Sequence, residues 1–287
     1  MKKIVILGCE NSHANHFLKA IREDYEDIEV IGVYSNEPEA SKKLCEEFGV
    51  AIMNSFDETV GKVDGVVITA RHGDNHYKYA KPYIESGVPM FIDKPITCSG
   101  DEAVSFMQEL KANGVKIAGG SSLRHAEVIK NLRRGREEKT GGDTLGGFVK
   151  APLQNKSVYG GFYFYAQHLV EMVLEMFGRY PKSVKAFNSG LECKTVVFRY
   201  EDYDVTALYT ENSYTYYAVR VATEENSGGA VSLDGCFEAE FREFYDLLEG
   251  NGKMMSYEDF ISPVFVMDAI AESLKSGEEC FVKEYKI

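Results

Sequence analysis

The residues after the first apolar run, in KKIVILGCENSHANHF, have types and spacing suited to holding the diphosphate of a dinucleotide. Such a loop uses glycine for a tight bend, for close backbone approach to the pyrophosphate and for close packing of helix on strand. Gly8 fills the first glycine position, whereas Glu10 and His13 occupy the second and third. The Glu10 carboxylate would repel a diphosphate, while His13 and the following helix N-terminus offer hydrogen-bond donors. The loop by itself leaves both dinucleotide binding and its loss open.

The end of the second apolar run bears on the choice between NAD and NADP. An acidic residue there usually binds the ribose hydroxyls of NAD, and an arginine nearby accommodates the 2′-phosphate of NADP. The sequence at this point is Tyr34-Ser35-Asn36, which offers neither residue type. The predicted cofactor is therefore NAD or NADP, with the choice left open.

Alternating strands and helices over residues 1–121 must position this loop. The runs IVILG, IEVIGVYS, VDGVVITA, VPMFID and VKIAGG predict strands, and helical patterns separate them. This alternation predicts a Rossmann domain of the α/β class, with a doubly wound parallel sheet and a ligand crevice at the carboxyl ends of its strands. We expect this dinucleotide-binding domain to span residues 1–121.

The pattern changes after residue 121. The segment RRGREEKTGGDTLGG is charged and rich in glycine, and predicts a mobile, solvated loop. The runs KTVVFRY, YDVTALYT and YTYYAVRVAT predict antiparallel strands, and FEAEFREFYDLLEG and DFISPVFVMDAIAESLKSG predict helices. Residues 122–287 are therefore expected to form an α+β domain with an open, mainly antiparallel sheet that binds substrate and supports a homo-oligomer.

Composition excludes several classes of function. The 287-residue chain has a formal net charge of -13, which disfavours nucleic acid and anionic membranes as partners. Its apolar runs are too short to cross a bilayer, and the N-terminus does not resemble a signal peptide.

Six dispersed cysteines suggest reduced thiols in a cytoplasmic protein. His72 and His76 have helical spacing, but no cysteine or carboxylate joins them at a ligand spacing, so no metal site is predicted.

A longer stretch, VVITARHGDNHYKYAKPYIESGVPMFIDKP, resembles the Gfo/Idh/MocA family, which includes glucose–fructose oxidoreductase and inositol dehydrogenase. His76, Ala80, Gly87 and Asp93-Lys94-Pro95 match its motif, with aspartate in place of the family's glutamate. GGSSLRH, which contains Arg124, and GGFYFYAQHLVEMVLEMFG resemble later family segments. The resemblance thus extends over nearly the whole chain and is weaker in the second half.

The resemblance implies hydride transfer between a nicotinamide cofactor and a carbinol carbon of a sugar-like or polyol substrate. It assigns Lys94 and His168 as catalytic residues, with Lys94 at the substrate hydroxyl and His168 as the proton-transfer group. A histidine titrates near neutrality, and an ammonium stabilises a developing alkoxide, so the residue types suit these roles. The dinucleotide is expected to contact Gly8, Glu10, Asn11, Ser12, His13, Ser35, Asn36, Thr69, Ala70, His76, Asp93 and Lys94. The substrate is expected to contact Arg124, Tyr163, Tyr165 and His168.

One departure concerns the histidine. The family has an aspartate four residues before it, and here that position is Phe164, so His168 has no acidic partner there to orient its ring. Together with Glu10, this leaves an alternative open: a non-catalytic Rossmann-based sensor or binding protein that no longer uses a nicotinamide cofactor. The catalytic hypothesis requires Lys94 and His168 to converge over a shared cleft.

Overall fold

A computed structural model describes residues 1–189, 192–211 and 213–287, which divide into two compact units. The first unit comprises Met1–Gly120, Phe237–Tyr257 and Ile287, and the second comprises Ser121–Cys236 and Glu258–Lys286. The expected second domain was a continuous segment over residues 122–287. The structure differs in this respect, because one segment near the C-terminus joins the first unit.

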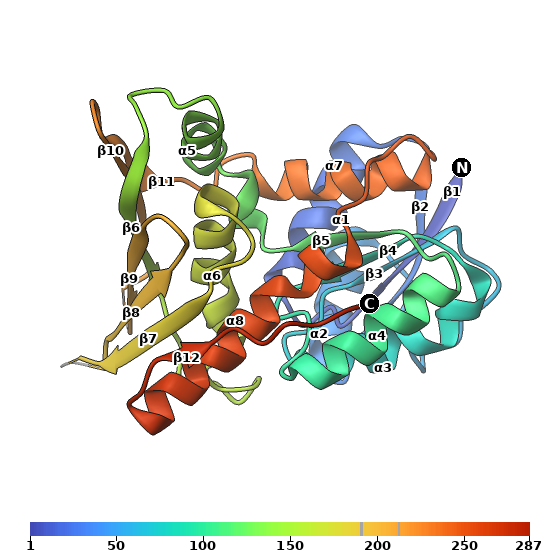
Figure 1. The fold of residues 1–287 in the computed structure, drawn as a ribbon. Coiled ribbons are helices and arrows are strands. Elements are labelled where there is room, and N and C mark those ends of the chain that lie inside the picture. Colours follow the sequence, from blue (N-terminus) through green and yellow to red (C-terminus); the bar gives the residue numbers. More distant parts are fainter. Residues whose placement is uncertain (190–191, 212) are drawn as a thin grey trace. The chain divides into compact units, whose positions relative to one another are not determined.

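Five parallel strands form the sheet of the first unit, in the order β2-β1-β3-β4-β5 (Figure 1). They are β1 (Lys2–Leu7), β2 (Ile28–Tyr34), β3 (Gly65–Ile68), β4 (Met90–Asp93) and β5 (Ile117–Gly120). Between them lie α1 (Ser12–Asp24), α2 (Pro38–Phe48), α3 (Asp74–Ala80), η1 (Lys81–Ser86) and α4 (Gly100–Ala112). The predicted doubly wound parallel sheet is confirmed. Strand order reverses between β1 and β3, which is where such sheets bind ligands.

Helix α7 (Cys236–Leu248) explains why a late segment joins the first unit. Its residues Phe241, Phe244 and Leu247 are almost fully buried in a core cluster with Phe17 of α1 and Phe91 of β4. Burial of a phenylalanine or leucine side chain contributes roughly 1.5–3 kcal/mol. The amphipathic helix therefore packs where the sheet offers an apolar face, although most of its sequence neighbours belong to the second unit.

The second unit contains a seven-stranded sheet in the order β11-β10-β6-β9-β8-β7-β12. The strands are β6 (Thr144–Pro152), β7 (Ser183–Asn188), β8 (Lys194–Arg199), β9 (Asp204–Thr210), β10 (Tyr216–Ala222), β11 (Ser227–Val231) and β12 (Cys280–Phe281). The remaining helices are η2 (Ser122–His125), α5 (Glu127–Glu137), α6 (Tyr163–Phe177) and α8 (Tyr257–Ser276). The β6–β9 pair is parallel and the other pairs are antiparallel, which confirms the predicted mixed, mainly antiparallel sheet.

The charged, glycine-rich segment over residues 133–147 is exposed along much of its length, as expected, but it is not a loop throughout. Helix α5 continues through Gly135 to Glu137, and β6 begins at Thr144. The turn between them surrounds Arg220 of β10, whose side chain is buried and donates to the carbonyl oxygens of Thr140 and Gly142 at 2.7 and 2.6 Å. A buried guanidinium must satisfy its donors, so it orders this segment.

The two faces of the seven-stranded sheet differ in their partners. Helices α5 and α6 lie on one face (Figure 1), where the inward side chains are buried. On the face away from these helices, Val197, Leu208 and Val219 are partly exposed, and Phe187 and Tyr217 are 47% and 43% exposed. The alternation along each strand therefore places apolar side chains on both faces.

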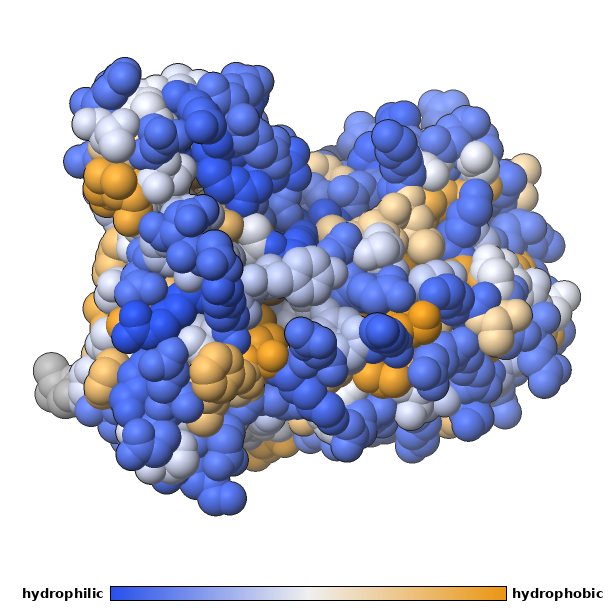
Figure 2. Space-filling view, viewed as in Figure 1, coloured by the Kyte–Doolittle hydropathy of each residue, from blue (hydrophilic) through white to orange (hydrophobic). Residues whose placement is uncertain are grey.

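Among the described residues, no helix is long and apolar enough to span a membrane. All six cysteines are free thiols. In the view of Figure 2, hydrophilic residues cover most of the visible surface, with hydrophobic residues scattered between them.

Candidate functional site

The first glycine of the dinucleotide loop is required by the packing at the ends of β1 and β3. Gly8 has a φ of 79°, and a Cβ added to it would lie 2.4 Å from the Cα of Ala70. The Thr69 hydroxyl donates to the Gly8 carbonyl oxygen at 3.1 Å. Gly8, Thr69 and Ala70 therefore meet at the point where strand order reverses, which is the predicted location of a dinucleotide crevice.

Glu10, at the second glycine position, is directed toward the ends of two strands. Its carboxylate accepts a hydrogen bond from the Ser35 hydroxyl at 2.7 Å and one from the Arg71 backbone N–H at 3.1 Å. Ser35 directly follows β2, and its hydroxyl also accepts from the Glu37 backbone N–H at 3.0 Å. The carboxylate thus lies beside the end of β2, the position where the sequence itself has no acidic residue.

Asn11 and His13 connect the same loop to the Asp-Lys-Pro motif. Asn11 is the N-cap of α1 and accepts from the His13 backbone N–H at 3.3 Å, while its own amide donates to Asp93 Oδ2 at 2.9 Å. His13 Nδ1 lies 2.9 Å from the same Asp93 oxygen. Ser12 donates weakly, at 3.5 Å, to the Asn11 side chain. His13 replaces a glycine of the family pattern, and Asp93 replaces a glutamate. These two altered residues contact each other in the buried interior.

Asp93 is fully buried and also accepts the backbone N–H of Lys94 at 2.7 Å. Burial acts to raise the pKa of the Asp93 carboxyl, but the adjacent His13 and Lys94 outweigh it and hold that pKa below its ordinary value. Lys94 is 3% exposed, and its peptide bond to Pro95 is cis. The ionised carboxylate therefore links the dinucleotide loop to the backbone of the candidate catalytic lysine.

His76 has a supporting position in the same region. Its ring is buried, with Nε2 2.8 Å from the Ala70 carbonyl oxygen and Nδ1 3.2 Å from that of Ile96. Burial lowers the pKa of His76, and the nearby Asp93 charge opposes that effect. The imidazole bridges the loops that follow β3 and β4, so it orders the predicted cofactor crevice. Asn36, also predicted to contact the cofactor, accepts from the Tyr34 hydroxyl at 2.8 Å.

In the second unit, His168 has an orienting partner that sequence reasoning missed. Its Nδ1 lies 2.7 Å from the Ser121 hydroxyl, which also accepts the Leu123 backbone N–H at 3.3 Å. The rings of Tyr165 and Tyr216 pack edge-on against His168, with centroids 5.2 and 6.4 Å away. Ser121 directly follows β5 in the segment GGSSLRH, but nothing in the sequence pairs it with a histidine 47 residues later.

The other residues predicted to contact substrate have mixed positions. Arg124 lies in η2, three residues after Ser121, and is partly exposed. The Tyr163 hydroxyl donates to Asp268 of α8 at 2.7 Å, so it joins two helices. Glu171, one helical turn after His168, accepts from Arg179 at 3.0 Å and so forms part of a structural ion pair.

The residues of the first unit fit a dinucleotide in two respects. Gly8 gives the tight bend with positive φ that ends β1, and the N-terminus of α1, capped by Asn11, follows it. The side chains of Ser35 and Glu10 offer a hydroxyl and a carboxylate of the kinds that bind ribose. In the second unit, an imidazole with one nitrogen engaged by a hydroxyl can accept a proton on the other.

Comparison with known proteins finds a similar oxidoreductase family, a curated relative and solved structures of similar fold. Residues 2–121 match the model of an oxidoreductase family with an NAD-binding Rossmann fold. A curated relative, the uncharacterized oxidoreductase YhhX of Escherichia coli (strain K12), is 22% identical over 135 residues. That match covers 44% of this chain and 39% of the relative, so the chain spans well under half of its length.

Two solved structures show that the likeness in fold extends over both units. The myo-inositol dehydrogenase from Corynebacterium glutamicum ATCC 13032 has a TM-score of 0.85 at 15% identity, covering 99% of this chain and 100% of that one. The WlbA dehydrogenase from Chromobacterium violaceum, in complex with NADH and UDP-GlcNAcA, has a TM-score of 0.78 at 16% identity, covering 99% and 97%. At these identities the likeness shows the fold alone. With the family model matched over residues 2–121, it confirms the resemblance to the Gfo/Idh/MocA family of NAD-binding oxidoreductases that is seen in the sequence.

Proposed function

We propose that this protein is a dehydrogenase that transfers hydride between a nicotinamide cofactor and a CH–OH group of a sugar-like or polyol substrate. The buried Asp93 carboxylate carries the proposal, because it joins Asn11 and His13 of the cofactor loop to the backbone of Lys94. The names of similar structures, a myo-inositol dehydrogenase and a dehydrogenase bound to NADH and UDP-GlcNAcA, support this substrate class. The first unit would hold the dinucleotide and the second the substrate.

In the proposed reaction, Lys94 has the charge-stabilising role and His168 the proton-transfer role. A nicotinamide dinucleotide held by the loop after β1 would supply the hydride acceptor. Lys94 stabilises the alkoxide charge that develops on the substrate oxygen, and His168 takes the hydroxyl proton at Nε2. This role requires the tautomer in which Nδ1–H donates to the Ser121 hydroxyl, so Ser121 replaces the missing acidic partner at position 164.

Substitutions at Lys94 and Ser121 test these roles in a turnover assay with NAD or NADP and a panel of inositols and sugars. Lys94→Ala should lower kcat by about 10²–10⁴-fold, as expected when a group that stabilises transition-state charge is removed. Ser121→Ala should lower kcat about 10–100-fold, because the His168 ring loses its orienting partner. The matched control is Ser122→Ala, a neighbouring serine that is equally buried. Equal turnover in the Ser121 and Ser122 variants would contradict the proposed role of Ser121.

We also propose that the cofactor is NAD rather than NADP, with Glu10 as the discriminating residue. The Glu10 carboxylate lies beside Ser35 at the end of β2, where related folds carry the acid that binds the ribose hydroxyls. A negative charge there favours free hydroxyls and repels a 2′-phosphate. Under this interpretation Glu10 supplies from the glycine loop the carboxylate that the end of β2 lacks.

Glu10→Gln removes the charge and preserves the shape of the side chain. Calorimetric titration should show weaker NAD binding and stronger NADP binding, with the preference for NAD reduced at least tenfold, or about 1.4 kcal/mol. Glu39→Gln, at an exposed acid paired with Lys42, is the control and should change neither affinity. If Glu10→Gln strengthened the binding of NAD and of NADP equally, the carboxylate would instead repel the diphosphate, as the sequence pattern suggests. Absence of binding by either dinucleotide to the native protein would favour the non-catalytic sensor.

The depressed pKa of Asp93 predicts a pH-dependent contribution to stability. Because the folded-state pKa lies below the unfolded value of about 3.9, the stabilisation is complete above that value and is lost as pH falls below it. Asp93→Asn should lower the free energy of unfolding at pH 7 by about 3 kcal/mol, since it leaves buried donors without their anion. In urea titrations, the difference in unfolding free energy between the two proteins should narrow from pH 5 to the acid limit of folding. It narrows because protonation of Asp93 removes the stabilisation that its charge provides. Asp24→Asn, at an exposed acid, should show no such narrowing.

Self-association through the second unit's sheet is a further part of the proposal. The face away from α5 and α6 carries Val197, Leu208 and Val219, and Tyr217 beside them is 43% exposed. Apolar side chains gathered on a flat sheet face are typical of subunit interfaces. We therefore propose a homo-oligomer that buries this face.

Sedimentation equilibrium measures the assembly directly. The native protein should have a mass of two or more times that of its 32.2 kDa chain. Val219→Glu should shift it toward the monomer, because a buried charge opposes association. Ile52→Glu changes an exposed residue of the first unit and should leave the assembly intact. A monomeric native protein would rule out the interface.

A further inference from the structure

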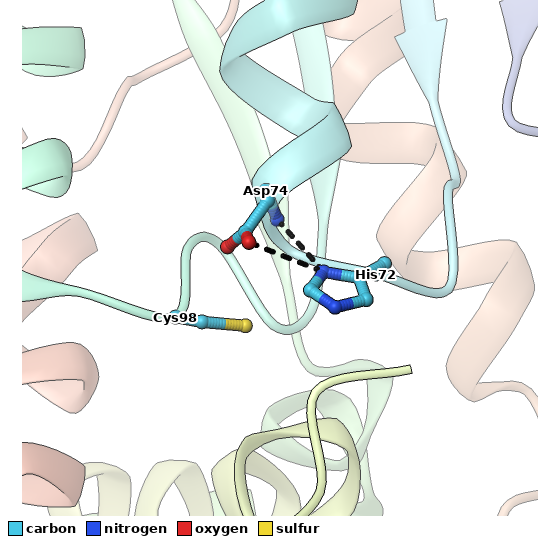
Figure 3. A group of neighbouring side chains, drawn as sticks. All are labelled: His72, Asp74 and Cys98. Atoms are coloured by element: carbon cyan, nitrogen blue, oxygen red, sulfur yellow. Dashed lines mark hydrogen bonds and ion pairs between the residues drawn. The ribbon is translucent and has the colours of Figure 1, made fainter. Parts of the chain in front are cut away.

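Three side chains with metal-binding atoms meet in the first unit, in the loops that follow β3 and β4. His72 lies in the turn before α3, Asp74 is the first residue of α3, and Cys98 lies four residues after Lys94 (Figure 3). One ligand atom from each residue lies within 4.8 Å of the other two. His72 Nδ1 and Asp74 Oδ2 are 3.7 Å apart.

Gly73 makes this meeting possible. A Cβ added to Gly73 would lie 2.9 Å from the carbonyl carbon of Thr97, 3.0 Å from the Pro95 carbonyl oxygen and 3.1 Å from the Cys98 backbone nitrogen. All three atoms belong to backbone, which cannot move aside as a flexible side chain would. The glycine therefore lets the loop after β4 pack against the turn after β3, which brings Cys98 to the two residues that flank Gly73.

The donor set and its spacing match a known class of metal. Imidazole nitrogen, carboxylate oxygen and thiolate sulfur bind Zn²⁺ at about 2.0–2.3 Å, so tetrahedral ligands are roughly 3.3–3.8 Å from one another. The separation of 3.7 Å between His72 Nδ1 and Asp74 Oδ2 falls within that range, and the Cys98 thiol lies within 4.8 Å of both residues' ligand atoms. A thiolate disfavours Mg²⁺ and Ca²⁺, which prefer oxygen ligands alone. We propose that His72, Asp74 and Cys98 bind one divalent transition-metal ion of the zinc class.

The orientation of His72 is set by its neighbour in the cluster. The Asp74 backbone N–H donates to His72 Nδ1 at 3.3 Å, and Asp74 Oδ2 lies 3.7 Å from the same nitrogen. The imidazole therefore already faces the Asp74 carboxylate.

The site is open to solvent on one side. The side chains of His72 and Asp74 are 31% and 61% exposed, so an ion can enter without unfolding of the loops. Three protein ligands leave a fourth position for water or another ligand, as in zinc sites that take part in reactions. Cys98 and Lys94 share one loop, so the ion would also fix the loop that carries the proposed catalytic lysine.

Cobalt binding tests the site without cofactor or substrate, so its outcome is independent of the proposed dehydrogenase activity. Co²⁺ added to the full-length apoprotein should bind with one equivalent per chain and produce the near-ultraviolet charge-transfer absorption of a Co²⁺–thiolate bond. Zn²⁺ should displace Co²⁺ and raise the melting temperature. Cys98→Ser should abolish the absorption band, whereas Cys45→Ser, which changes another partly exposed thiol of the first unit, should preserve it.

A second variant is needed because Cys98→Ser could lose the absorption band simply by failing to fold. Asp74→Asn changes an exposed side chain and should keep the fold, judged by circular dichroism, while lowering the Co²⁺ affinity at least tenfold. The proposal is overturned if the native protein shows no stoichiometric thiolate band, if Cys98→Ser retains the band, or if Asp74→Asn binds Co²⁺ as tightly as the native protein.

Discussion

The buried carboxylate of Asp93 is the interaction on which the candidate site depends. It accepts the Asn11 amide and the Lys94 backbone N–H, and it contacts the His13 imidazole, within a region closed to water. A buried charge is stable only when its partners are in place, so these contacts form together or not at all. The loop after β1 and the loop after β4 are consequently held as one piece. The geometry of Lys94 therefore depends on residues more than 80 positions earlier in the chain.

The contacts of the glycine loop explain its unusual sequence. In the sequence alone, Glu10 and His13 indicate the loss of two glycines from a dinucleotide-binding motif. In the structure each has a defined partner: His13 contacts Asp93, and Glu10 bridges Ser35 and Arg71. A loop that had merely degraded would not be expected to acquire matched partners at both altered positions. His168 likewise has a defined partner although position 164 is phenylalanine, because its Nδ1 lies 2.7 Å from the Ser121 hydroxyl.

The fold could be predicted largely from the sequence, because its signals are local. Apolar strand runs such as VDGVVITA, together with the glycines that end α2 and η1, indicate the first sheet, and alternating aromatic runs indicate the second. The contacts of the candidate site could not be predicted, because His13–Asp93 and Ser121–His168 join residues far apart in sequence. The proximity of His72, Asp74 and Cys98 could not be predicted for the same reason, since His72 and Cys98 come from separate loops. The length of helix α5 was underestimated, because Gly135 and the high charge indicated a loop from residue 133 onward. The turn after the helix is ordered by Arg220, which comes from a distant strand.

A double-mutant cycle on dinucleotide binding tests the central claim most directly. NAD affinity would be measured by calorimetry for the native protein, His13→Ala, Asp93→Ala and the double variant. If the two residues act as one unit, each single change weakens binding and the second adds little, with a coupling energy of about 1–3 kcal/mol. Additive effects, or affinities unchanged by either substitution, would contradict the account.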